Sequence, residues 1–369
     1  MLERPQKLVP KEELLSQLWK DSHVTEAVLK TYLSEIRRAL RESAKAPRFI
    51  ETAHGRGYRF IGAVERSGGA APQGPPADVM PVDGAHFVGR DGEIARLQRA
   101  FEQTLEHRRQ VVFIAGEAGI GKTLLVKRFL ERVSKRDDVS VGWGQCVDQY
   151  GSGEPYLPVL EALRRLSRGA KGDFVSQILR RDAPSWLAQM PGLLPAASAE
   201  RVGPALPERM LREMAEALES LTEQRSLVLW LEDLQWADPS TLDLLSYVAQ
   251  RSDPSRLLVL VTYRPLEALD SQRLSQITQH LKLRNRCEEL ALPYLNEHAI
   301  EHYLALRFGQ HDLPAGVASE LLSRTNGNAL FIVTVVDWWL ESGALTEANG
   351  SWRLSSPLAQ LARGVPDTL

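Results

Sequence analysis

A glycine-containing stretch carries the residue types with the clearest chemical potential. It occupies residues 109–130, where the motif GxxxxGK[ST] begins at Gly116 and ends at Thr123, between an apolar run and a helical pattern. Glycines let backbone N–H groups approach an anion, and the helix that follows adds unpaired N–H groups and its positive dipole end. The stretch therefore predicts a phosphate-binding loop, with Lys122 reaching the β- and γ-phosphates and the Thr123 hydroxyl binding Mg²⁺.

Acidic and basic residues end two further apolar runs. Five apolar residues at 227–231 predict a buried strand that ends at Glu232 and Asp233. The carboxyl ends of parallel strands meet at the ligand crevice, so we expect both acids to face the phosphates. Another apolar run, 256–265, predicts a strand ending on Arg264. Strands that alternate with helices in this way predict a doubly wound parallel sheet.

Two phrases outside these strands point to a family. The sequence HFVGRDGE opens the segment before the phosphate loop, and TNGNALF occupies residues 325–331 in a helical region that starts after Glu288. Together with the phosphate loop they resemble the hhGRxxE entry segment and the GNPLF-like lid phrase of STAND-class AAA-type ATPases. The resemblance implies ATP and ADP as ligands and a helical lid after the sheet.

The same resemblance implies a role for each polar residue at the site. Glu232 and Thr123 would hold Mg²⁺, Asp233 would polarise the attacking water, and Arg264 would sense the γ-phosphate. Glu232 stands where the family more usually has Asp, so the resemblance implies nucleotide binding with slow hydrolysis. The residues expected to bind the nucleotide are Val88, Gly89, Arg90, Gly116, Gly119, Gly121, Lys122 and Thr123.

The amino-terminal segment is the basic part of the chain. Residues 1–63 hold 12 Lys and Arg against 8 Asp and Glu. Helical patterns at 10–19 and from Thr25 to about Arg41 are followed by two short β-like pieces joined by AHGRG. This layout is typical of a winged helix-turn-helix, and the phrase FIETAHGRGYRFIG resembles the OmpR/PhoB-type DNA-binding domain.

This second resemblance implies that the helix from Thr25 enters the major groove and that the wing contacts the minor groove or backbone. Arg37 and Arg38 suit phosphate or guanine contacts. Glu35 stands where the family often has a basic residue, so a different sequence preference or weaker affinity is expected. The residues expected to bind DNA are Lys30, Thr31, Ser34, Arg37, Arg38, Thr52, His54 and Arg56.

Composition and motifs predict an α/β multidomain chain. The first small sheet and most of the first helix of the OmpR/PhoB-type domain have no counterpart in this sequence. The last residues resemble the entrance to the domain that follows in STAND ATPases. We therefore expect truncation at both ends. The expected segments are a winged-helix domain (1–63, incomplete at its start), a linker rich in Gly, Pro and Ala (64–84), a P-loop ATPase domain (85–284), a helical lid (285–345) and the start of a further domain (346–369).

Overall composition excludes several classes of protein. An apolar content of 43% and a net charge of −2 are ordinary for a soluble protein. Cys146 and Cys287 are far apart in sequence, which excludes a disulfide framework and favours packing cysteines in a reducing cytosol. No apolar run approaches the ~18–20 residues that span a bilayer, and the first 25 residues lack a secretory pattern. We therefore expect a cytoplasmic protein with no membrane partner.

The sequence favours an ATP-binding transcriptional regulator that uses nucleotide as a switch for binding double-stranded DNA. Self-association with ATP and contact with RNA polymerase are the further partners expected. ATP can favour a DNA-competent assembly only by binding that form more tightly than the resting form. Two alternatives remain open: an ATPase enzyme proper, and a nucleotide-binding scaffold whose amino-terminal head docks protein rather than DNA.

Overall fold

The computed structural model falls into two compact units, Met1–Gln73 and Gly74–Leu369, and each is considered by itself. The structure describes residues 8–10, 49–53, 57–61, 86–147, 154–190, 206–270, 272–309, 311–348 and 350–355.

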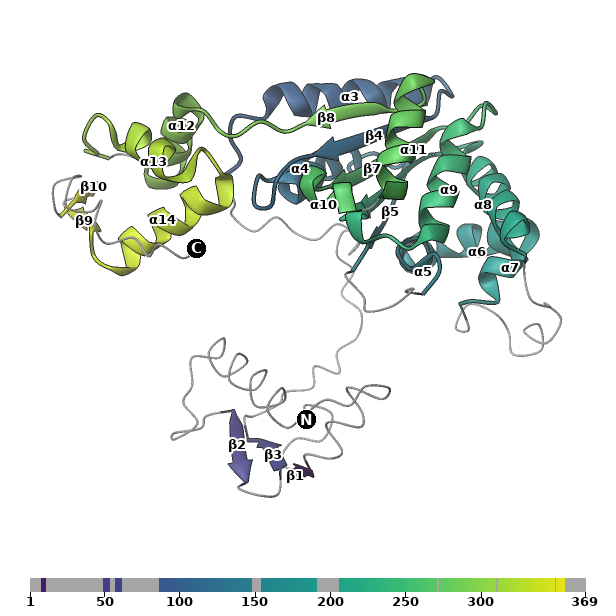
Figure 1. Ribbon diagram of the computed structural model, residues 1–369, viewed down its shortest axis with the longest axis horizontal. Coiled ribbons are helices and arrows are strands. Elements are labelled where there is room, and N and C mark those ends of the chain that lie inside the picture. Colours follow the sequence, from purple (N-terminus) through teal and green to yellow (C-terminus); the bar gives the residue numbers. More distant parts are fainter. Residues whose placement is uncertain are drawn as a thin grey trace. The chain divides into compact units, whose positions relative to one another are not determined.

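The first unit contains a three-stranded antiparallel sheet (Figure 1). Strand β2 (Ile50–Ala53) and strand β3 (Gly57–Phe60) form the hairpin that the two β-like pieces predicted, and Thr52 lies opposite Tyr58. Strand β1 (Leu8–Pro10) pairs with the other edge of β3 and was not predicted. The two helices expected for this unit lie outside the described residues.

The second unit is built on a five-stranded parallel sheet, as predicted. The order β5-β6-β7-β4-β8 places β7 between the strand of the phosphate loop and the strand of the acids. Strands β4, β6 and β7 match the predicted apolar runs, whereas β8 was not predicted. The strands are β4 (Gln110–Ala115), β5 (Val139–Gln145), β6 (Ser226–Glu232), β7 (Leu257–Tyr263) and β8 (Glu288–Ala291).

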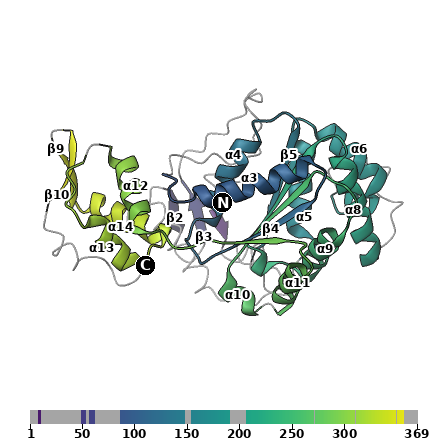
Figure 2. The ribbon, with the colours of Figure 1, turned by 90° about the horizontal axis from the view of Figure 1, so that it is seen from above.

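Helices cover both faces of this sheet, because alternate side chains of each buried strand point to opposite sides. In β6, Leu229 joins one apolar cluster while Val228 and Trp230 join the other. Figure 2 shows the helices on either side of the sheet. One face carries α3 (Asp91–Leu105) and α4 (Lys122–Val133); the other carries α5 (Leu157–Arg168), α6 (Gly172–Asp182), α7 (Pro184–Leu187), α8 (Pro207–Thr222), α9 (Pro239–Gln250) and α11 (Gln272–Leu283).

Helix α5 lies directly on the edge strand β5. A Cβ on Gly144 would come within 1.8 Å of the Pro158 carbonyl oxygen, so only glycine permits this close approach. The Arg165 guanidinium stacks on the Trp143 ring with 3.6 Å to its centroid. The described helices α5 to α8 therefore pack on one face of the sheet.

The lid is a three-helix group followed by a hairpin, and its helices share one apolar core that contains Ile300, Leu321 and Val336. Leu345 and Trp352 of the hairpin pack against that core. The lid consists of α12 (Glu297–Phe308), α13 (Val317–Thr325), α14 (Ala329–Glu341), β9 (Leu345–Ala348) and β10 (Ser351–Leu354).

These elements differ from the predicted segment boundaries at two points. The sheet continues through β8 to Ala291, past the predicted end of the ATPase domain at residue 284 and into the region expected to be helical. The hairpin packs with the lid, although residues from 346 onward were expected to begin a further domain. Among the described residues, no helix is long and apolar enough to cross a membrane.

Candidate functional site

The loop between β4 and α4 has the backbone shape that its glycines predicted. Gly119 and Gly121 have φ angles of +73° and +102°, in the left-handed region that favours glycine. A Cβ on Gly116 would lie 2.8 Å from the Ile120 side chain, so this position also excludes larger residues. A close approach at Gly116 and a positive φ at Gly119 and Gly121 therefore explain why glycine occupies these three positions.

The carbonyl groups at the start of the loop accept hydrogen bonds from the loop's own lysine. Lys122 Nζ donates to the carbonyls of Gly116 at 2.7 Å and Glu117 at 2.9 Å. The side chain is buried, and burial lowers its pKa, as does the nearby charge of Arg264. A buried ammonium group thus lies inside the loop, where an anion would stabilise its charge.

The next three carbonyls accept from groups outside the loop. Asn328 Nδ2 donates to Ala118 O at 2.9 Å, and Leu330 N donates to Gly119 O at 3.0 Å. Arg90 Nη2 donates to Ile120 O at 3.1 Å. The carbonyls of residues 116 to 120 therefore all accept hydrogen bonds, and the Ile120 N–H is engaged as well, because it donates to Glu117 O at 3.3 Å. Since C=O and N–H of a trans peptide point in opposite directions, each bonded carbonyl also fixes the direction of the N–H in its own peptide group.

The residues predicted to bind metal lie together. Thr123 Oγ1 donates to Glu232 Oε1 at 2.5 Å. Glu232 is only 8% exposed, and this burial raises the pKa of its carboxyl group; the hydrogen bond from Thr123 lowers that pKa and neighbouring Asp233 raises it. A hydroxyl and a buried carboxylate thus meet at the first turn of α4.

Asp233 is held by two side-chain amides. Gln235 Nε2 donates to Asp233 Oδ1 at 3.2 Å, and Gln145 Nε2 donates to Oδ2 at 3.4 Å. The Asp233 backbone is left-handed, with φ of +56°, and its N–H donates to Thr262 Oγ1 on the neighbouring strand β7. Neither glutamine was predicted, although Gln235 lies only two residues after Asp233.

Arg264 follows β7 and is linked to the same network. Its backbone N–H donates to Gln235 Oε1 at 3.1 Å. Its guanidinium pairs with Glu267 at 2.8 Å and lies over the Trp236 ring, 5.0 Å from the centroid. The buried Nε has no hydrogen-bond partner among the described residues, so the guanidinium retains a donor for a further acceptor.

A cavity of about 540 Å³ adjoins the phosphate loop. Val88 and Arg90 of the entry segment and Gly121 of the loop, which were predicted to bind nucleotide, line it. Gly89 does not line the cavity; it packs under the lid, where a Cβ would lie 2.7 Å from Ala299 Cβ. The remaining lining residues are His86, Phe87, Ile120, Leu124, Leu295, Tyr303, Arg307, Ala329, Ile332, Val333 and Asp337.

None of the lid residues that line this cavity was predicted to bind nucleotide. His86 contacts the Tyr303 ring edge-on, with centroids 6.0 Å apart. Arg307 donates to the Tyr303 hydroxyl on its own helix α12 and pairs with Asp337 on α14. In the sequence these residues look like ordinary members of amphipathic helices, so periodicity alone offered no signal for them.

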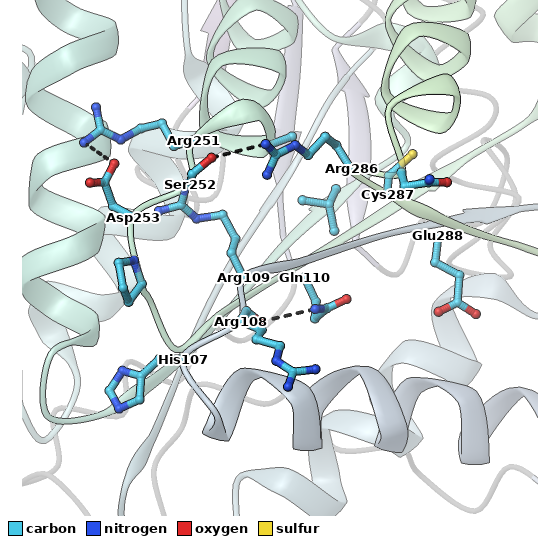
Figure 3. Close-up of a pocket in the computed structure, with 14 residues that line it drawn as sticks. His107, Arg108, Arg109, Gln110, Arg251, Ser252, Asp253, Arg286, Cys287 and Glu288 are labelled. Atoms are coloured by element: carbon cyan, nitrogen blue, oxygen red, sulfur yellow. Dashed lines mark hydrogen bonds and ion pairs between the residues drawn. The ribbon is translucent and has the colours of Figure 1, made fainter.

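A second cavity, of about 390 Å³, lies at the amino ends of β4, β7 and β8 (Figure 3). Although arginines line it, their charges are largely matched by acids: Arg109 and Arg251 both pair with Glu219. Figure 3 shows Arg286 directed at Ser252. The arginines thus tie α8, α9 and β4 together, far from the phosphate loop at the other ends of the strands.

Most of the residues predicted to bind DNA lie outside the residues that the structure describes. Thr52 is described and lies in β2. The others lie outside the described residues: Lys30, Thr31, Ser34, Arg37, Arg38, His54 and Arg56. Within the described residues there is no group of three or more His, Cys, Asp or Glu side chains that could hold a metal ion by itself.

Family models match two parts of the chain. Residues 86–261 match the AAA ATPase domain, and residues 1–60 match the C-terminal domain of transcriptional regulatory proteins. An uncharacterized protein of Rhizobium meliloti (strain 1021) is 27% identical over 317 residues, which cover 78% of this chain and 30% of that protein. The transcriptional regulator HilA of Salmonella typhi is 42% identical over 73 residues, which cover 20% of this chain and 13% of HilA.

Among solved structures, Cdc6p from Pyrobaculum aerophilum superimposes with a TM-score of 0.45 and 13% identity, over 72% of this chain and 66% of that one. The chain spans less than a third of the length of the two curated relatives named above.

Proposed function

We propose that this chain, which joins an OmpR/PhoB-type transcriptional-regulator domain to an AAA ATPase domain, binds DNA under the control of an adenine nucleotide. The observation that carries the proposal is the phosphate loop itself. Its carbonyls from 116 to 120 are all engaged, its glycines allow close approach, and an apolar cavity opens beside it. This combination suits a ligand with an anionic end and a flat apolar end.

In this proposal the phosphates lie against the loop and the adenosine occupies the cavity. Lys122 and the first N–H groups of α4 meet the negative charges. Val88 and Ile332 offer apolar surface to the base, and His86 and Tyr303 add aromatic edges. A cavity of about 540 Å³ is within the usual size range for sites that bind small ligands.

Thr123 and Glu232 form a donor set that fits Mg²⁺. Both offer oxygen atoms, which this hard cation prefers, and Mg²⁺ sites next to phosphates commonly use only one or two protein carboxylates. Glu232 is buried with a raised pKa, so a cation would relieve the cost of its negative charge. The ion, when bound, neutralises charge on the phosphate oxygens.

Asp233 and Arg264 are the proposed agents of slow hydrolysis. Asp233 is held by Gln145 and Gln235 and would polarise the water that attacks the γ-phosphorus. In the same proposal Arg264 senses the γ-phosphate; in support, its charge lowers the pKa of Lys122, and its Nε has no hydrogen-bond partner among the described residues. Replacement of its contact to Glu267 by one to phosphate would distinguish ATP from ADP.

The switch follows from linkage. If ATP binds the DNA-competent form more tightly than the resting form, DNA must raise the affinity for ATP by the same factor. Self-association with ATP is the assembly that we propose for that form, and RNA polymerase is a proposed further partner.

Lys122→Ala tests the proposal, with Lys135→Ala as a control because Lys135 is an exposed cation just past the other end of α4. We expect Lys122→Ala to abolish ATP binding measured by calorimetry and to remove the effect of ATP on DNA retention. The control should bind ATP like the wild type. A wild-type chain indifferent to adenine nucleotides would refute the nucleotide site.

DNA binding is tested separately by retention of duplex DNA at increasing salt. Binding through phosphate neutralisation releases counterions, so retention should fall steeply as salt rises. Absence of DNA retention at low salt, with ATP binding intact, would favour the scaffold whose head docks protein.

A further inference from the structure

The amino-terminal end of α14 reaches the phosphate loop from the lid. Asn328 caps this helix, with its Oδ1 accepting from the Leu330 N–H at 3.1 Å. Its Nδ2 donates in the other direction, to the Ala118 carbonyl at 2.9 Å. One side chain, only 6% exposed, therefore links the start of a lid helix to a loop 210 residues away in sequence.

The bond to Ala118 fixes the direction of one peptide group of the phosphate loop. The Ala118 carbonyl and the Gly119 N–H belong to one planar trans peptide, so holding the carbonyl on the lid side turns the N–H away from the lid. Leu330 N holds the next carbonyl, that of Gly119, while the N–H of the same peptide group, that of Ile120, donates to Glu117 O within the loop. Two consecutive peptide groups of the loop are thus oriented by donors from the lid.

The phosphate loop and the lid segment that carries Asn328 are closely packed against each other. A Cβ on Gly119 would lie 2.7 Å from Leu330 Cβ and 2.9 Å from Asn328 Oδ1. The lid segment is itself held, because Leu295 N donates to Gly327 O at 2.8 Å and a Cβ on Gly327 would lie 2.1 Å from Leu295 O. The Asn328 amide is therefore presented to the loop by a backbone with little freedom to shift.

We infer that Asn328 is a positioning residue for phosphate binding: it sets the direction of the Gly119 N–H, so the lid must be docked for the loop to hold phosphate at full strength. This inference rests on the proposed nucleotide site. It adds a specific coupling, because docking of the lid and binding of the phosphates then favour one another by the same factor.

Two substitutions at Asn328 separate the amide donor from the helix cap. Asn328→Ser keeps a neutral oxygen for the cap but has no donor that reaches Ala118. Asn328→Asp also keeps the cap, and places a carboxylate beside the Ala118 carbonyl. Asn296→Asp is the matched control, because Asn296 caps α12 in the same lid by accepting from Ala299 N at 2.9 Å.

The measurement is the competition of ADP and of adenosine against a fluorescent nucleotide on the full chain. The ratio of the two dissociation constants reports what the phosphates contribute. We expect this ratio to fall about fivefold in Asn328→Ser, the loss that one neutral hydrogen bond typically accounts for. The fall should be larger in Asn328→Asp, and the ratio should be unchanged in Asn296→Asp.

Other outcomes would overturn the inference. Equal losses for ADP and adenosine would mean that the substitutions damage the lid and its cavity rather than the phosphate loop. An unchanged ratio in Asn328→Ser, with a loss only in Asn328→Asp, would assign the effect to the added charge. In both cases the wild type still binds ADP and the proposed function stands, whereas a wild type without ADP binding removes both proposals.

Discussion

Gly119→Ala should destabilise the nucleotide-free protein more than Gly121→Ala, because only the first substitution meets the lid. Both glycines have positive φ, so an alanine at either costs about 1–2 kcal/mol of backbone strain. At Gly119 the new Cβ would also press on Leu330 and Asn328, at 2.7 and 2.9 Å. At Gly121 it would meet no described atom within 4 Å. Overpacking of this kind adds about 1–3 kcal/mol.

We therefore expect losses of about 1–2 kcal/mol for Gly121→Ala and about 2–5 kcal/mol for Gly119→Ala, measured by thermal unfolding without nucleotide. In domains of 150–250 residues each kcal/mol lowers the melting temperature by about 2–4 °C. The two variants should therefore differ by roughly 2–12 °C. Equal melting temperatures would show that the lid does not pack on the loop in solution, and the reasoning about Asn328 would lose its basis.

Glu232→Gln should raise the melting temperature of the nucleotide-free chain at pH 7 and leave it unchanged near pH 4. Burial raises the folded-state pKa of this carboxyl group above 4.5, so its negative charge costs stability as pH rises through that raised value. A melting temperature of Glu232→Gln below that of the wild type at pH 7 would contradict the burial argument. Addition of Mg²⁺ should raise the ATP affinity of this variant less than it raises that of the wild type. Asp233→Asn should retain ATP binding and lose phosphate release, and release at the wild-type rate would exclude Asp233 as the group that polarises water.

The central strands could be predicted because each is a long apolar run buried on both faces. Strand β6 is fully buried from Ser226 to Glu232, and its short continuous apolar run is typical of a strand covered on both faces. Strand β8 is an edge strand of four residues that begins with two glutamates, so it has no such signal. Strand β1 spans only Leu8–Pro10 and depends on pairing with a distant hairpin.

In the candidate site, too, contacts between recognisable motifs could be predicted, whereas contacts set by the tertiary fold could not. The pairing of Thr123 with Glu232 follows from two motifs whose strands share one sheet edge. The contact of Asn328 with Ala118 depends on how the lid folds back onto the loop, and no local pattern encodes that. The GNPLF-like phrase indicates the segment, whereas the hydrogen bond from its asparagine to the phosphate loop arises only in the tertiary structure.

The thiol groups of this chain have a practical consequence for following the lid. Cys146 is buried, and burial raises the pKa of Cys287, at the edge of the second cavity, to about 11. The thiolate is the reactive form of cysteine, so a raised pKa lowers the reactivity of Cys287 at pH 7. A maleimide dye should therefore leave both native thiols nearly untouched, so a single cysteine introduced at the exposed Leu330 can carry a spectroscopic label in an otherwise wild-type background.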